Sequence, residues 1–179
     1  MQKSSLRGLT LAAVLAALYA ALTILLPVPQ YAGVQVRFAE ALTVLPWLFP
    51  AATPGLIVGC ALANLFSPFP LDVLFGSLAT ALACLWTRRI RRRALVALPA
   101  VVCNAVIIGA EAAFFEVGAS RAFPAAFALN ALTVALGEIL SACILGALLL
   151  TAFLRSEALR SLIPPERLAL LRSQKEDKP

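Results

Sequence analysis

Acidic side chains embedded in long apolar stretches are the residues of this sequence best suited to chemistry. Glu40, Glu111 and Glu138 interrupt runs of alanine, leucine, valine and phenylalanine, and Asp72 follows the uncharged segment 41–71. Charged groups are costly inside an apolar medium, so those present usually face a cavity or a polar partner. Carboxylates accept hydrogen bonds and pair with cations, whereas amide side chains both donate and accept. The pattern predicts one polar cavity inside an otherwise apolar protein.

The residue types and motifs that the sequence lacks argue against catalysis by this chain. It contains no histidine, which excludes histidine metal sites and catalysis of the Ser-His-Asp or Cys-His type. Its four cysteines are isolated in apolar runs and have the character of small core residues. No phosphate-binding GxxxxGK[ST] loop is present, so we expect no ATPase activity. We therefore predict that the chain is not an enzyme and uses no metal or other cofactor.

The composition indicates that these polar residues lie in a membrane protein. The chain has 179 residues, of which 61% are hydrophobic and 13% charged, and its mean hydropathy is +0.92. A typical soluble domain is about half apolar and a quarter charged. These values exclude a disordered protein, a nucleic-acid-binding domain and an ordinary cytosolic enzyme. Residues 8–36 and 41–71 carry no charge, and each run exceeds the roughly 20 apolar residues that a spanning helix needs.

We predict an all-α integral membrane protein with six transmembrane helices in one bundle. The predicted spans are residues 8–26, 38–49, 55–66, 71–87, 94–115 and 124–154. Helices 2 and 3 are short because Pro46, Pro50 and Pro54 break this part of the chain. They are either two tilted short helices or a re-entrant hairpin. One domain, 1–154, is followed by a charged tail, 155–179, which is either a surface helix or a frayed end.

The distribution of lysine and arginine predicts the orientation. With the N-terminus in the cytoplasm, six crossings place 13 of the 15 basic residues inside and leave Arg37 and Arg121 outside. Both termini are therefore predicted to be cytoplasmic. We interpret the five arginines of segment 88–93 as a topology anchor against anionic lipid rather than as a nucleic-acid-binding patch.

This topology places most of the unusual polar residues in the outer half of the bundle. Asn104 and Glu111 are seven residues apart and share a helix face, and Asn130 and Glu138, eight apart, share another. Their alternative role is interhelical hydrogen bonding, and Arg37 could simply pair with Glu40 one turn later. The candidates for substrate binding are Gln35, Arg37, Glu40, Asp72, Asn104, Glu111, Asn130 and Glu138.

Helix 1 shows a separate pattern of small residues. Ala12, Ala16 and Ala20 recur every four residues, and such a face lets another helix approach closely. The approaching helix could belong to a partner protein or to the same chain.

Several segments together resemble the QueT family of queuosine-precursor transporters. The most specific is 35–46, QVRFAEALTVLP, although Ala39 stands where serine is more common in the family. Weaker similarities follow in the same order, and the resemblance covers roughly residues 8–150. These are Pro54-Gly55-Leu56 with Gly59 and Asn64, Leu71-Asp72-Val73 with Phe75-Gly76 and Thr80, and Pro99 with Asn104.

The resemblance implies a function that spacing alone does not establish. QueT proteins are similar to the S-components of energy-coupling factor (ECF) importers, six-helix proteins of the bacterial cytoplasmic membrane that bind a vitamin-like solute from outside. Such proteins work with a transmembrane coupling subunit and two cytosolic ATPases. In that group the small-residue face of helix 1 docks on the coupling subunit, which implies docking by Ala12, Ala16 and Ala20 here.

The implied substrate is a 7-deazaguanine such as queuine or its aminomethyl precursor. A guanine-like edge presents adjacent donors to a carboxylate and an acceptor oxygen to an amide or arginine. A second carboxylate could pair with an aminomethyl cation. The alternatives are an S-component for another flat vitamin and a stand-alone proton-coupled carrier. A membrane enzyme acting on lipid would need a catalytic cluster, and none is evident.

Overall fold

The computed structural model describes residues 2–26 and 36–176, and every regular element within these ranges is helical. In chain order the elements are α1 (Gln2–Leu25), the 3₁₀ helix η1 (Phe38–Trp47), α2 (Ala52–Asn64), α3 (Asp72–Thr87), the short 3₁₀ turn η2 (Arg93–Leu95), α4 (Leu98–Val117), α5 (Phe123–Glu138), the π-helical segment η3 (Ile139–Leu145), α6 (Gly146–Arg155), α7 (Glu157–Arg160) and α8 (Pro165–Glu176). The predicted all-helical class is confirmed.

Three helical stretches among the described residues are long and apolar enough to cross a membrane. They are Leu6–Leu25, Arg93–Val117 and Phe123–Arg155, the last of which joins α5, η3 and α6. The helices Ala52–Asn64 and Asp72–Thr87 are apolar but shorter. Many large apolar side chains on the helices are exposed, including Leu74, Leu129 and Leu148, as expected where lipid rather than water surrounds the bundle.

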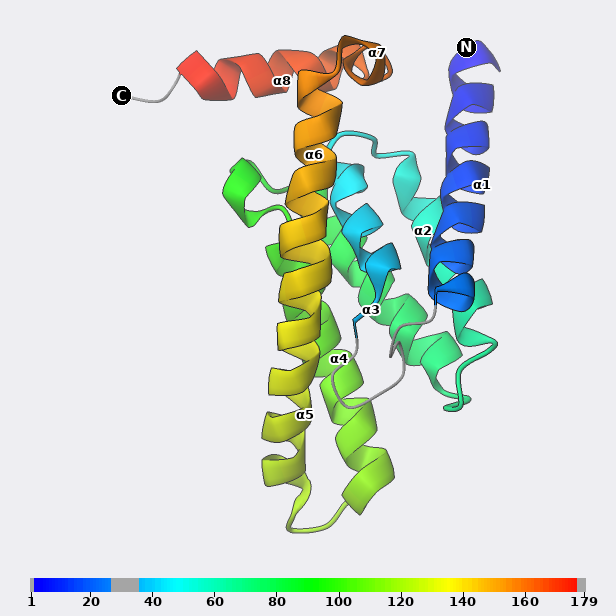
Figure 1. The fold of residues 1–179 in the computed structure, drawn as a ribbon, viewed down its shortest axis with the longest axis vertical. Coiled ribbons are helices and arrows are strands. Elements are labelled where there is room, and N and C mark those ends of the chain that lie inside the picture. Colours follow the sequence, from blue (N-terminus) through cyan, green and yellow to red (C-terminus); the bar gives the residue numbers. More distant parts are fainter. Residues whose placement is uncertain (1, 27–35, 177–179) are drawn as a thin grey trace.

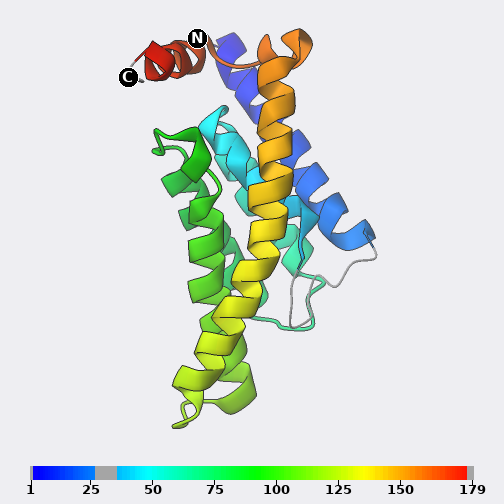
Figure 2. The ribbon, with the colours of Figure 1, turned by 60° about the vertical axis from the view of Figure 1, so that its left-hand side comes forward.

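Successive helical segments run back and forth along the bundle (Figures 1 and 2). The start of α1, the end of α6 and the helices α7 and α8 lie at one end, and the α4–α5 hairpin projects furthest at the other (Figure 1). Arg93 Nη2 donates to Thr151 Oγ1 on α6 at 2.7 Å, which ties the arginine segment to the end carrying α7 and α8. Within the described ranges, the segments that carry the basic residues predicted to be cytoplasmic therefore share one end of the bundle.

The segment predicted as short helix 2 is a 3₁₀ helix rather than an α-helix. Pro46 has no amide hydrogen and cannot make the α-helical bond to residue 42. A 3₁₀ helix rises by about 2 Å per residue, so ten residues reach about 20 Å, compared with about 15 Å for an α-helix. Residues 39–49 are all buried, so η1 lies in the centre of the bundle.

Helices α1 and α2 pack with their backbones in contact. A Cβ atom at Gly55 would lie 2.2 Å from the carbonyl oxygen of Ala12, and one at Gly59 would lie 2.7 Å from that of Ala16. Ala12 and Ala16 are buried in this contact, whereas Ala20 is half-buried. The expectation that Ala12 and Ala16 face a partner subunit is therefore corrected: they pack inside the chain, against the glycines of α2.

Candidate solute-binding site

An arginine, an asparagine and an aspartate anchor a buried polar cluster at the start of η1. Arg37 donates from Nη1 to Asn64 Oδ1 at 3.3 Å, and its Nη2 lies 3.8 Å from Asp72 Oδ2. Asn64 in turn donates from Nδ2 to the backbone oxygen of Asp72 at 2.9 Å. Arg37 thus forms an ion pair with α3, and Glu40, the local partner that sequence spacing allowed, also lies within electrostatic reach of it.

The position of Asn64 depends on a glycine in the facing helix. A Cβ atom at Gly76 would lie 2.4 Å from Asn64 Nδ2, so only glycine leaves room for the amide. Asn64 is 1% exposed and also donates to Cys60 Sγ at 3.4 Å. This packing fixes the amide that holds the arginine and α3 together.

Glu40 connects the cluster to α1. The hydroxyl of Tyr19 donates to Glu40 Oε1, and Tyr19 is fully buried. The other oxygen, Glu40 Oε2, is buried and has no hydrogen-bond partner within the described ranges. Glu40 also lies beside Arg37 and Asn104. It therefore sits at the junction of α1, η1 and α4.

Glu138 enters the cluster from the long helix. Asn104 Nδ2 donates to Glu138 Oε1 at 3.0 Å, and Glu138 Oε2 is buried without a partner among the residues described. The π-helical segment η3 begins directly after Glu138. π-Helical turns are rare and frequently occur at functional sites. Asn104 thus lies between two carboxyl groups, those of Glu40 and Glu138.

Glu111 is the acidic residue of the cluster that lines a surface groove. It lies beside Asp72, and neither of its carboxyl oxygens has a hydrogen-bond partner in the part of the chain that is described. A groove of about 540 Å³ along α3 and α4 reaches Glu111. The other lining residues are apolar and include Phe75, Phe114 and Phe115. A flat ligand in this groove could place a ring against an aromatic face and a polar edge toward the carboxyl group.

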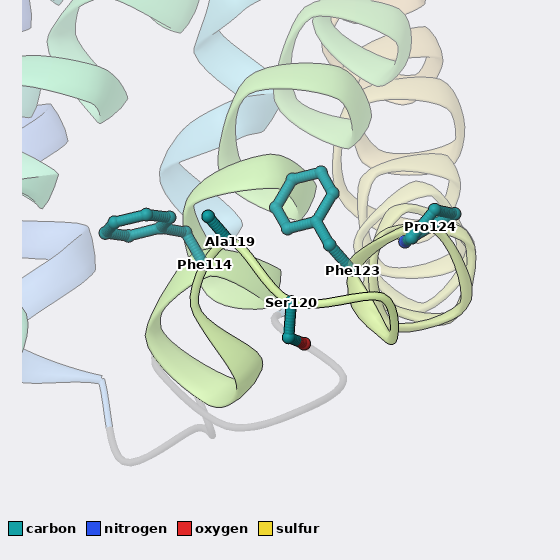
Figure 3. A pocket seen from close by; sticks show the side chains of 5 residues that line it. All are labelled: Phe114, Ala119, Ser120, Phe123 and Pro124. Carbon is teal, nitrogen blue, oxygen red and sulfur yellow. The ribbon is translucent and has the colours of Figure 1, made fainter.

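A second hollow lies at the tip of the α4–α5 hairpin and differs from the groove in its lining. It has a volume of about 420 Å³ and is lined by Phe114, Ala119, Ser120, Phe123 and Pro124. Figure 3 shows Phe114 on α4 and Phe123 on α5, with Ser120 in the connection between the helices. No charged residue lines it, so this hollow has none of the chemistry of the buried cluster.

Six of the eight candidate residues converge in the cluster: Arg37, Glu40, Asp72, Asn104, Glu111 and Glu138. Asn130 does not join them, because its amide donates to Glu116 Oε2 at 2.9 Å. Gln35 lies outside the described residues. Tyr19 belongs to the cluster but was not among the candidates, although a hydroxyl in an apolar helix needs a partner and could have signalled its role.

An apolar helical bundle around a buried polar cluster defines a membrane protein of the transporter class. The profile of the QueT transporter family matches residues 9–155 of the sequence, and the chain belongs to this family. No curated protein and no solved structure matches it.

Proposed function

We propose that this protein is the substrate-binding S-component of an ECF-type importer and that it captures a queuosine precursor from outside the cell. The family membership supports transport of such a solute. The geometric support is a set of unsatisfied acceptors: Glu40 Oε2, both oxygens of Glu111 and Glu138 Oε2 are buried without hydrogen-bond partners among the described residues. Buried polar groups are normally paired, so these oxygens require donors from elsewhere.

A 7-deazaguanine has the donors that this arrangement lacks. Its guanine-like edge places a ring N–H beside an exocyclic amine, and a carboxyl group can accept from both. In the proposed pose, Glu111 accepts from this edge while Phe75 or Phe115 contacts the ring. The aminomethyl group of a queuosine precursor then points inward, toward Glu40 and Glu138. Queuine, or another deazaguanine with a basic side arm, fits the same description.

The protein is proposed to depend on partners for energy. The sequence has no phosphate-binding loop, so a coupling subunit and two cytosolic ATPases would drive release of the solute into the cell. On this proposal the chain crosses a bacterial cytoplasmic membrane six times and does not act as an enzyme. Ala13 and Ala17 are small residues of α1 that remain exposed, and they replace Ala12 and Ala16 as the proposed docking face.

Equilibrium binding of radiolabelled 7-deazaguanines to the purified protein tests the substrate. The aminomethyl compound is expected to bind with saturation and to be displaced by unlabelled queuine but not by thiamine or riboflavin. Displacement by one of those flat vitamins instead would assign the protein to another substrate.

The buried acidic residues also favour a second function, that of a proton-coupled carrier acting alone. The two proposals differ in their need for partners. Cells that express this chain without ECF ATPases are expected to bind the precursor but not to accumulate it. Accumulation without the ATPases, abolished by an uncoupler, would establish the carrier.

A further inference from the structure

The buried cluster has more acidic groups than a bound solute and one arginine can neutralise. Among the described residues it holds four carboxyl groups, those of Glu40, Asp72, Glu111 and Glu138, and each residue is at most 8% exposed. Within the same part of the chain, the guanidinium of Arg37 supplies one positive charge beside them, and it forms an ion pair with Asp72. Three carboxyl groups therefore remain without a counter-ion of their own.

Neighbouring groups supply hydrogen bonds to these carboxyl groups but no further positive charge. Glu40 accepts from Tyr19, Glu138 accepts from Asn104, and Glu111 lies beside Asp72. An isolated ionised carboxylate in an apolar interior is so costly that the group is neutralised by a proton instead. The titratable and charged groups that face the cluster are Tyr19 from α1, Arg37 before η1, Cys60 from α2, Asp72 and Cys84 from α3, Cys103 from α4 and Cys143 from η3.

We propose that the empty site holds protons on its acidic cluster and that binding of a cationic precursor releases one of them. This inference rests on the proposed function. A carboxylic acid O–H bond of the cluster breaks, the proton passes to solvent, and the resulting carboxylate pairs with the ammonium group of the ligand. The total charge within the protein is unchanged, so the cation enters the bundle without adding buried charge.

The proton belongs to the cluster rather than to one residue. Glu40 and Glu138 lie within electrostatic reach of each other, as do Glu111 and Asp72. Acidic groups that interact this strongly lose protons in steps that belong to the set. The groove that reaches Glu111 connects the cluster with the surface of the bundle.

Proton release predicts a sign for the effect of pH. A lower pH keeps the cluster protonated, so the cation must displace a proton against a higher proton concentration. Affinity for the aminomethyl precursor therefore rises with pH, by at most about tenfold per pH unit for one released proton. An uncharged 7-deazaguanine with a nitrile in place of the aminomethyl group displaces no proton, and its affinity does not change with pH.

Isothermal titration calorimetry on the full-length protein in detergent measures the release directly. The binding heat of the aminomethyl compound is measured at one pH in phosphate and in Tris, which differ in ionisation enthalpy. We expect the difference to correspond to about one proton released per ligand, and to none for the nitrile compound. Equal heats in both buffers for the aminomethyl compound, with binding intact, would overturn the exchange and leave the proposed function standing. An equal release by both compounds would also overturn it.

Absence of binding by every 7-deazaguanine is a different outcome, which removes the proposed function and the inference together.

Two variants localise the effect. Glu138→Gln is expected to lower the number of protons released, and Glu116→Gln, which lies outside the cluster and accepts from Asn130, is expected to leave it unchanged. Melting temperatures of both variants in the same detergent establish that they are folded. If folded Glu138→Gln still binds the aminomethyl compound and releases as many protons as the parent, Glu138 does not hold the exchanged proton. That result would contradict the proposal that Glu138 shares it.

Discussion

At the scale of single residues, Glu111 and Glu138 share a carboxyl chemistry but differ in surroundings. Glu111 opens onto the α3–α4 groove, whereas Glu138 is held by Asn104 inside the bundle. Asp72 differs from both because it is paired with Arg37, and removing one member of a buried pair destabilises the fold itself. Glu111 is therefore the carboxyl group whose replacement reports most directly on recognition of the ligand edge.

Replacing Glu111 by glutamine should weaken binding of the precursor. The amide keeps the shape but places an N–H donor opposite the donors of the ligand edge, and a buried donor left unpaired costs about 1–3 kcal/mol, which corresponds to roughly a 5- to 150-fold higher Kd. Equilibrium binding measures this change. Glu116→Gln is the matched control on the same helix, because Glu116 is exposed and hydrogen-bonded to Asn130, and it should bind like the parent. Equal losses in both variants would mean that Glu111 has no specific role.

Tyr19→Phe tests the link between α1 and the cluster. The substitution removes the hydroxyl that donates to Glu40 and leaves a buried carboxyl oxygen unpaired. We expect the free energy of unfolding to fall by about 1–3 kcal/mol. The melting temperature in detergent measures the loss. An unchanged melting temperature together with weaker binding would instead show that the hydroxyl contacts the ligand.

The convergence of six candidates could be predicted because polar side chains at membrane depth are costly to expose to lipid and therefore gather around polar partners. The hydroxyl of Tyr19 in an apolar helix signals the need for a partner, but that partner, Glu40, lies on η1, 21 residues away, and no spacing rule identifies it. The partner of Asn130 could not be predicted for a related reason. Helical periodicity placed it on the face of Glu138, and both lie on α5, but its amide donates to Glu116 on α4 outside the cluster.

At the scale of elements, the contact between α1 and α2 depends on glycine. Gly55→Ala places a Cβ atom where the backbone of Ala12 lies, so the helices must separate. Overpacking of this kind costs about 1–3 kcal/mol, and the better helix propensity of alanine offsets only part of it. The melting temperature should therefore fall. Gly8→Ala is the control, because its Cβ would lie at an ordinary 3.5 Å from Ala51 Cβ, and it should be neutral or slightly stabilising.

The opposite face of α1 tests the proposed docking. Ala13 and Ala17 are exposed, so a larger side chain there leaves the packing of the isolated chain intact. Ala17→Leu is expected to reduce co-purification with a coupling subunit several-fold while the Kd for the precursor stays the same. Ala16→Leu, in contrast, should lower the stability of the isolated protein, because Ala16 is buried against Gly59. Unreduced co-purification of Ala17→Leu would exclude this face as the docking surface.

The element types were less predictable than their order. Apolar runs and prolines located the helical segments, but they did not predict the long 3₁₀ form of η1 or the π-helical segment after Glu138, two elements that lie side by side in the bundle. Gly146 permits that contact, since a Cβ there would lie 2.7 Å from Val44 Cγ1. Long-range contacts of this kind leave no periodic signal in a sequence.

At the scale of the whole molecule, the distribution of basic residues and the arrangement of the helices favour the same orientation in the membrane. The arginine segment 88–93 and the C-terminal helices lie at one end, and the α4–α5 hairpin lies at the other (Figures 1 and 2). The end rich in arginine is expected to remain in the cytoplasm. The groove at Glu111 includes Phe123, the first residue of α5 at the hairpin end, so it would then be reached from outside.

Cysteine labelling in intact cells tests this orientation. Ser120 in the hairpin connection and Ser161 after α7 are both exposed and lie at opposite ends. A membrane-impermeant maleimide is expected to label Ser120→Cys in intact cells, and to label Ser161→Cys only after the membrane is permeabilised. The parent protein supplies the background, because its own Cys60 and Cys84 are buried and Cys103 and Cys143 are partly so. Labelling of Ser161→Cys alone in intact cells would invert the molecule, and it would place the opening at Glu111 on the cytoplasmic side, where an importer could not capture its solute.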